Sequence, residues 1–231
     1  DGLPVTVRTL VRSGPYALPR SLQAPAARSG DPDLTYLAAL DPGQVRVVEG
    51  RMPHGTASGG VVEAALPQAA AQRLRLAPGA RLTLTDRLGG PKVRVTLTGL
   101  YRPVRADSPY WQLDDLGGRG VKSLGFTSYG PLLADPGVLT GGRVSAGQSA
   151  WLASADFSTL TTGRIGELRE AARTGSAALR RQPVLSGTTA VTTNLPDVLT
   201  RVERSLLVSR STLLIVALQL ALLACCALLL V

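Results

Sequence analysis

The sequence contains very few of the side chains on which most enzymes and metal sites depend. Among its 231 residues there is one histidine, His54, and two adjacent cysteines, Cys225 and Cys226. A single histidine excludes most hydrolase mechanisms in which an imidazole acts as the base. Two neighbouring cysteines inside an apolar run build neither a disulfide framework nor a zinc site, and they behave there as small apolar side chains.

Aromatic residues and lysines are also scarce. Aromatic side chains make up 4% of the chain, so it lacks the platforms on which single-stranded nucleic-acid binders stack bases. The net charge is +9, and of 25 basic residues only Lys92 and Lys122 are lysines. The arginines are spread without a block of like charge, which indicates an arginine-rich codon bias. We therefore expect no nucleic-acid partner, and a basic surface suited to anionic lipid.

Three segments come close to known functional motifs without matching them. Gly55–Gly59 (GTASG) misses the G-x-S-x-G nucleophile elbow by one position. Gly117–Ser123 (GGRGVKS) lacks the Gly-Lys-Ser/Thr adjacency of a phosphate loop. Asp107, Asp114 and Asp115 could supply oxygen ligands to a hard cation, but their spacing fits no calcium loop and favours a solvated turn. We therefore predict that the chain is not an enzyme and has no catalytic residue, metal or cofactor.

The C-terminal segment Thr212–Val231 contains no charged residue. At about 1.5 Å per residue, a helix of this length covers about 30 Å, the thickness of the hydrocarbon core of a bilayer. A buried helix of a soluble protein seldom runs this far without a charge, and the segment is at the wrong end for a signal peptide. We predict a transmembrane helix over residues 212–231. Because the chain begins at Asp1 and ends inside the apolar run, we also expect it to be part of a longer protein.

The residues directly before this span continue the helical pattern. Pro196 and Asp197 suit the first turn of a helix. Beyond them, apolar and small side chains recur at steps of four and three, as in a coiled coil: Leu195, Leu199, Val202, Leu206, Ser209 and Leu213. The pattern predicts a membrane-proximal stalk helix over residues 195–211 that continues into the span. The same stripe also fits packing against the core of the domain, and the two interpretations are compatible.

Elsewhere, local patterns predict a chain rich in strands. The predicted elements are strands at Val5–Arg12, Leu34–Leu40 and Val61–Ala65, a helix at Pro67–Leu76, strands at Arg81–Thr85 and Lys92–Leu100, a loop-like stretch at Tyr101–Gly147, a strand at Gln148–Ser154, a helix at Thr159–Arg181 and a strand at Val184–Thr193. In the first strand we expect Val5, Val7 and Leu10 to share a face. In the central pair, one buried face is predicted to hold Leu82, Leu84, Val93, Val95 and Leu97.

Three passages share a pattern with a known family. Val48–Leu84 holds a Gly-Arg-Met-Pro turn, a strand with Glu63, an alanine-rich helix and a Pro-Gly turn. In Val93–Trp111 a strand ends in GLYRP and leads to PYW, and Leu195–Val231 is a long helix. Together these passages cover about half of the chain. In this order they resemble the extracytoplasmic part of FtsX-like (MacB-type) ABC transporter permeases.

This resemblance implies an α+β fold in three parts. A βαβ-type, porter-like subdomain is expected from residues 1–40 with 148–194. A β-rich insertion is expected at residues 41–147, and a long helix then enters the membrane. The implied location is the cell membrane, with the soluble part extracytoplasmic.

The resemblance also implies a mechanism and partners. A separate ABC ATPase subunit or domain hydrolyses ATP in the cytoplasm, and the permease works as a homodimer or with a second permease half. The helix from residue 195 then couples hydrolysis mechanically to export or envelope remodelling. We hypothesise that this coupling is carried by Leu199, Val202, Leu206 and Leu213.

One observation favours other interpretations. Arg201, Arg204 and Arg210 precede the span, and the positive-inside tendency places such residues in the cytoplasm. A tail-anchored cytosolic adaptor accounts for them. An envelope-anchored protein that binds peptidoglycan or lipid without transport also fits the sequence, whereas an anchored enzyme would need an active site that the sequence does not indicate.

Overall fold

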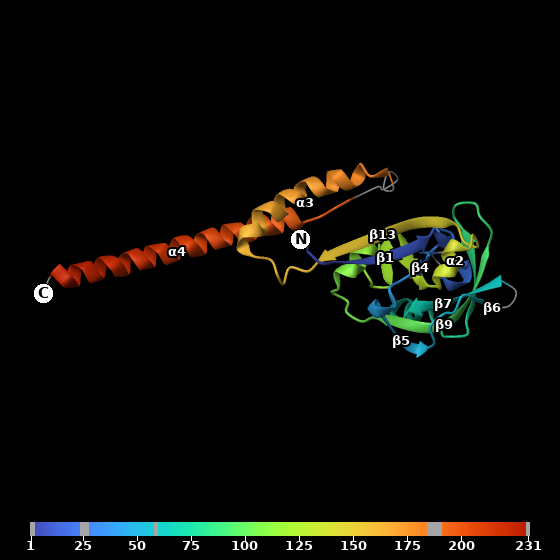
Figure 1. The fold of residues 1–231 in the computed structure, drawn as a ribbon. Helices are drawn as coiled ribbons and strands as arrows, with labels where there is room; N and C mark the ends of the chain where they lie inside the picture. The colour runs from blue at the N-terminus through green and yellow to red at the C-terminus, as the bar shows by residue number, and fades with distance from the viewer. Residues whose placement is uncertain (1–2, 24–27, 58–59, 184–190, 230–231) are drawn as a thin grey trace. The chain divides into compact units, whose positions relative to one another are not determined.

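The computed structural model describes residues 3–23, 28–57, 60–183 and 191–229 (Figure 1). The chain mixes helix and sheet and ends in a long helix, in agreement with the predicted α+β class. It forms two compact units. We call Val5–Ala155 the sheet unit and the part from Asp156 onward the hairpin unit, and we describe each by itself.

The sheet unit holds all the strands that the structure describes. These are β1 (Val5–Ser13), β2 (Tyr16–Ala17), β3 (Leu34–Thr35), β4 (Leu37–Ala39), β5 (Val45–Gly50), β6 (Thr56–Ala57), β7 (Val61–Pro67), β8 (Arg81–Asp86), β9 (Val93–Pro103), β10 (Val121–Leu124), β11 (Phe126–Tyr129), β12 (Leu132–Leu133) and β13 (Ala146–Ala155). Its helical segments are η1 (Arg20–Leu22), η3 (Pro42–Gln44), α1 (Gln68–Leu74), η5 (Pro109–Leu113) and α2 (Pro136–Thr140).

These strands form one continuous sheet. Its order is β10-β11-β3-β2-β8-β9-β7-β12-β4-β1-β13, with β5 added to β9 and β6 to β7. Most neighbours are antiparallel, but β7 and β9 run parallel, with α1 and β8 between them in the chain. The strand-helix-strand unit that the structure describes therefore lies in the centre of the sequence.

The central hairpin has the predicted register. Leu82 of β8 pairs with Val95 of β9, and Leu84 pairs with Val93. Because alternate residues of a strand point to the same face, these four side chains and Leu97 are buried together. The predicted buried face is confirmed. The helix that precedes the hairpin is shorter than predicted and ends at Leu74; the next residue, Arg75, has a φ of 57° in the left-handed region.

Both faces of the central sheet are buried. On β7, Ala64 and Leu66 belong to one apolar cluster, whereas Ala65 belongs to another. Leu132 and Leu133 of β12 divide between the two clusters in the same way. Strands buried on both sides read as unbroken apolar runs, which is why Val61–Pro67 shows little alternation.

The first strand corrects one expectation. Val5 and Val7 are 57% and 58% exposed, whereas Leu10 is buried. Odd-numbered and even-numbered positions of a strand face opposite ways, so Leu10 cannot share a face with the two valines. The strand itself is confirmed as β1, and Gln148–Ser154 lies within its antiparallel partner β13.

The stretch Tyr101–Gly147 is not a loop, contrary to the prediction. It contains η5, β10, β11, β12 and α2. Its strands are two to four residues long. They are completed by distant partners: Ser128 pairs with Leu34, and Leu133 pairs with both Ala38 and Ala65. Such short strands leave no periodicity for a sequence-based prediction to detect.

The hairpin unit is helical. It contains η6 (Thr162–Arg164), α3 (Ile165–Arg180) and α4 (Leu195–Leu229). The structure confirms the predicted helices, although α3 begins six residues later than expected. The predicted strand Val184–Thr193 falls mainly on residues 184–190, which lie outside the described residues, and residues 191–193 form no strand.

The residues of the predicted subdomains can be located in the two units. Strands from residues 5–40 and from residues 41–147 belong to the same sheet, and the compact units meet at Ala155 and Asp156. The subdomain of residues 1–40 with 148–194 and the inserted subdomain at 41–147 stay a prediction.

Candidate functional site

The long helix α4 is the first functional feature. Leu195–Cys226 is long and apolar enough to cross a membrane, and the structure buries none of its most apolar window. Large apolar side chains such as Leu214, Leu218 and Leu222 are more than half exposed. An uncovered apolar surface of this extent is typical of a helix whose solvent is lipid. The helix thus indicates membrane anchoring.

The first turns of α4 pack against α3. Leu199 of α4 is 5% exposed, and Ile165 of α3 is also buried. Glu203 of α4 forms an ion pair with Arg169 of α3. Leu199, Glu203 and Leu206 are spaced by four and three residues, so they lie on one face of α4. Before its apolar part, α4 is therefore one arm of a helical hairpin.

The structure separates the four predicted coupling residues. Leu199 is buried and Leu206 is half-buried on the packed face. Val202 is 41% exposed and Leu213 is 69% exposed, so these two lie outside the packed contact. Leu199 and Leu206 thus lie on the same face of α4, while Leu213 belongs to the apolar part of the helix.

The second feature is a pocket of about 820 Å³ in the sheet unit. It opens where two chain segments change partners within the sheet. Arg12 of β1 pairs with Ala38 of β4, but directly after the Gly14-Pro15 break, Tyr16 of β2 pairs with Thr35 of β3. Across this break, the Ser13 hydroxyl accepts a hydrogen bond from the backbone of Leu37 at 3.0 Å.

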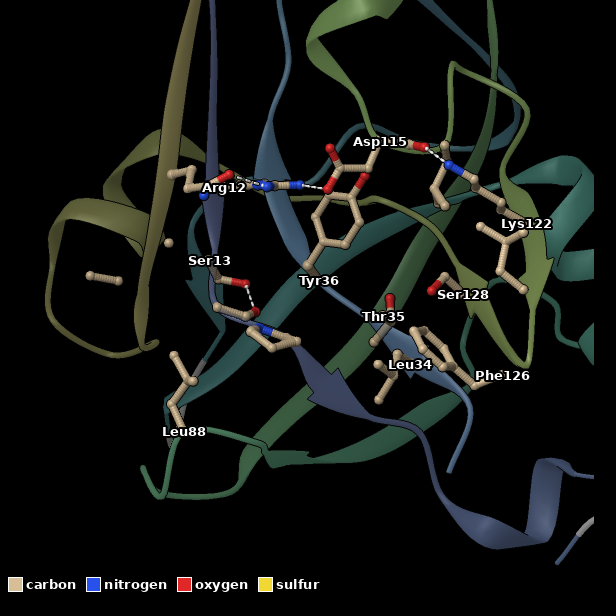
Figure 2. A pocket seen from close by; sticks show the side chains of 17 residues that line it. Arg12, Ser13, Leu34, Thr35, Tyr36, Leu88, Asp115, Lys122, Phe126 and Ser128 are labelled. Carbon is tan, nitrogen blue, oxygen red and sulfur yellow. Dashed lines mark hydrogen bonds and ion pairs between the residues drawn. The ribbon is translucent and has the colours of Figure 1, made fainter. Parts of the chain in front are cut away.

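One end of the pocket is charged (Figure 2). The Arg12 guanidinium donates to the carboxylate of Asp115 and to the side-chain oxygen of Gln148, and it lies 5.5 Å from the centre of the Tyr36 ring. Lys122 Nζ donates to the backbone oxygen of Asp115 at 3.0 Å. Two cations thus line this end: Arg12 forms an ion pair with the Asp115 carboxylate, whereas Lys122 contacts a backbone oxygen.

The other end of the pocket is apolar. Figure 2 shows Leu34 and Phe126 together, away from the Arg12 guanidinium, and Leu88 on a separate segment. Leu88 is 63% exposed, Leu124 67% and Phe126 44%. Leu88 lies directly over Gly14, where a Cβ would come within 2.7 Å of the leucine Cδ1. Three large apolar side chains, one at Leu88 and two on the β10–β11 hairpin, therefore line one hollow while open to solvent.

Asp114 is buried next to the charged end of the pocket. It is 4% exposed and accepts hydrogen bonds from the Tyr36 hydroxyl and from the backbone amides of Leu116 and Gly118. Burial raises the pKa of Asp114, and these donors oppose the shift. Burial, followed by the charge of Asp114, raises the pKa of Tyr36. The predicted solvated turn is thus wrong for Asp114.

A third cluster lies around Glu63 on β7. Arg51 donates two hydrogen bonds to the Glu63 carboxylate, at 2.8 and 2.6 Å, and the His54 backbone amide donates a third at 3.0 Å. These donors, the Arg51 side chain first, lower the pKa of Glu63 to about 2. The cluster fastens the chain before β6 to β7, so Arg51 and Glu63 of the quoted family-like passage form a structural contact.

Of the near-miss motifs, Gly55–Gly59 includes residues 58 and 59, which lie outside the described residues. Gly117–Ser123 passes through turns into β10 and precedes no helix. Among the described residues, no group of three or more His, Cys, Asp or Glu side chains gathers as a metal site would require. The sequence reasoning did not detect Arg12, Tyr36 and Gln148 as pocket residues, because only the sheet register brings them together.

Comparisons of the chain with protein-family models, with curated proteins and with solved structures find no match. The fold and the helix define the class: a mixed helix-and-sheet domain joined to a helix that is long and apolar enough to span a membrane.

Proposed function

We propose that this chain is the extracytoplasmic domain and following membrane helix of an FtsX-like (MacB-type) ABC transporter permease. In this function, ATP hydrolysis in a separate subunit or domain is coupled mechanically to export or envelope remodelling. The observation that carries the proposal is α4, which runs without interruption from the packed hairpin through the apolar segment. At about 1.5 Å per residue, its 35 residues extend about 50 Å.

The mechanism follows from the stiffness of a continuous helix. Motion applied to the apolar part of α4 reaches Leu199 and Leu206, because no proline or glycine breaks the helix between them and the span. The contact of α3 with α4, including the Arg169–Glu203 ion pair, makes the two helices move together. Leu199 and Leu206 are therefore the strongest of the four coupling candidates.

The partners and the finer fold belong to the same proposal. The chain works with an ABC ATPase subunit in the cell membrane, as a homodimer or beside a second permease half. Its soluble part is extracytoplasmic, and its βαβ-type subdomain (1–40 with 148–194) carries the insertion 41–147. The chain is not an enzyme itself and uses no cofactor.

Leu206→Asp tests the coupling. In the full-length permease with its ATPase, we expect the variant to insert into the membrane and the complex to hydrolyse ATP at about the wild-type rate. We expect transport, read as rescue of a strain that lacks the permease, to be lost. The physical reason is that a carboxylate on the packed face separates α4 from α3.

Leu207→Asp is the matched control, because Leu207 is the next residue along and is 59% exposed. This variant should rescue the strain as well as the wild type does. Full rescue by Leu206→Asp, or equal loss with both variants, would contradict coupling through the packed face.

A tail-anchored or envelope-anchored binding protein without transport is the alternative, and the three arginines before the span favour the cytosolic form. The side of the membrane on which the sheet unit lies separates the cytosolic adaptor from the permease.

A further inference from the structure

The pocket at the sheet break has a charged end and an exposed apolar lining. Leu88, Leu124 and Phe126 are each exposed by 44% or more, yet all three line the same hollow. Exposed apolar side chains that are scattered need no explanation, but those gathered in a concave site mark a place for an apolar group. These residues therefore offer an apolar surface on which a hydrocarbon tail could be buried.

The charged end adds a preference for the head of the ligand. Of the two cations that line this end, Arg12 forms an ion pair with Asp115, whereas Lys122 contacts only a backbone oxygen among the described residues. Arg12 is held by three partners, so its position is fixed before any ligand arrives. Lys122 is exposed and uses a single contact, to a backbone oxygen. Its remaining hydrogens are thus available to an anion.

We infer that this pocket binds a single-chain anionic amphiphile, with the tail between Leu88, Leu124 and Phe126 and the head at Lys122 and Arg12. The volume of about 820 Å³ lies within the range of about 300–1,000 Å³ found for small-molecule sites. A free fatty acid and a lysolipid of the bilayer share this chemistry. The inference is independent of the proposed transport function, because it uses the sheet unit alone.

The test is photolabelling of the full chain in lipid nanodiscs. The first probe is a long-chain carboxylate with a photoreactive diazirine in its tail, and mass spectrometry locates the labelled peptides. We expect labelling of the peptides that contain Leu88, Leu124 and Phe126. A second probe carries the same tail with a trimethylammonium head, and should label these peptides about fivefold less because the head meets like charge.

Two variants with matched controls test the two ends separately. Lys122→Gln should reduce pocket labelling by the carboxylate about fivefold, whereas Lys92→Gln changes the other exposed lysine and should leave it unchanged. Leu124→Ser should reduce labelling about tenfold, whereas Val104→Ser, at a position 56% exposed and outside the pocket, should not. All four positions are on the surface, and unchanged tryptophan fluorescence verifies folding.

The apolar part of α4 serves as an internal reference, since it meets any probe dissolved in the bilayer. Pocket labelling that follows the variants while α4 labelling stays constant supports the inference. Labelling confined to α4, equal labelling by both probes, or no effect of Leu124→Ser would overturn it. A third probe, with the same tail in a lysophospholipid of the nanodisc, identifies the source: labelling by it points to the bilayer, and labelling by the free acid alone points to a soluble ligand.

Discussion

At the residue scale, two consecutive carboxylates have opposite surroundings. Asp114 is buried beneath the pocket, where it accepts hydrogen bonds from Tyr36 and two backbone amides. The side chain of Asp115 is 64% exposed and binds Arg12 at the rim. In the turn after η5, Asp114 thus fixes the backbone of the turn, and Asp115 fixes the side chain of Arg12 in the pocket.

The Asp114 contacts predict a graded loss of stability. Tyr36→Phe removes one donor, and we expect it to lower the unfolding free energy by about 1.5 kcal/mol, the usual value for a hydrogen bond to a charged group. Asp114→Ala should cost more, because it leaves the Tyr36 hydroxyl and two amides without an acceptor. Thermal unfolding of the chain in nanodiscs, followed by the fluorescence of buried Trp111, measures both. Equal stability of the two variants and the wild type would contradict this role.

Glu63 predicts a dependence of stability on pH. Its pKa in the folded chain is about 2, against an ordinary value of 4.5, so folding favours the charged form. Its contribution is complete above about pH 4.5 and disappears as the pH falls toward about 2. Glu63→Gln should therefore lower the unfolding temperature at neutral pH and flatten its decline in acid. Parallel curves of unfolding temperature against pH for variant and wild type would refute this linkage.

Sequence reasoning reached some of these residues and missed others for physical reasons. Glu63 and Arg51 were visible in the family-like passage, although their mutual contact was not. Asp114 was expected in a solvated turn, because nothing nearby in the sequence shows that Tyr36 covers it. The sites of Arg12 and Gln148 depend on pairing between strands more than a hundred residues apart.

At the element scale, a helix or strand could be predicted from the sequence when it was long enough to show a regular apolar pattern. The β8–β9 hairpin and its buried face could be predicted because both strands alternate over several residues. The helix α4 could be predicted because its pattern runs for 35 residues. The strands β10 to β12 could not, because segments of two to four residues between glycines carry no periodic signal.

The sheet break at the pocket belongs to the same scale. Leu34–Leu40 was predicted as one strand, but Tyr36 divides it into β3 and β4, which pair with different neighbours. The apolar pattern runs through the break, so the sequence gives no sign of it. The pocket exists because of that division, and for this reason it was not among the predicted sites.

At the scale of the whole molecule, the proposed topology predicts which reagents reach the sheet unit. Thr83 is exposed on β8, and Thr83→Cys can be placed in full-length protein that lacks other cysteines, including Cys225 and Cys226. A membrane-impermeant maleimide should label this cysteine fully in intact cells, because the sheet unit is proposed to be extracytoplasmic. Labelling only after lysis would instead support the tail-anchored adaptor.

The pairing of β1 with β13 has a mechanical consequence. Val5 and Ala155, where the chain enters and leaves the sheet unit, are direct partners at one end of an antiparallel pair. Tension applied between these two points would load the hydrogen bonds one after another, as in opening a zipper, and not all at once. Under the proposed coupling, this ribbon would open from its Val5–Ala155 end, and the pocket residues Arg12 and Gln148, near its other end, would separate last.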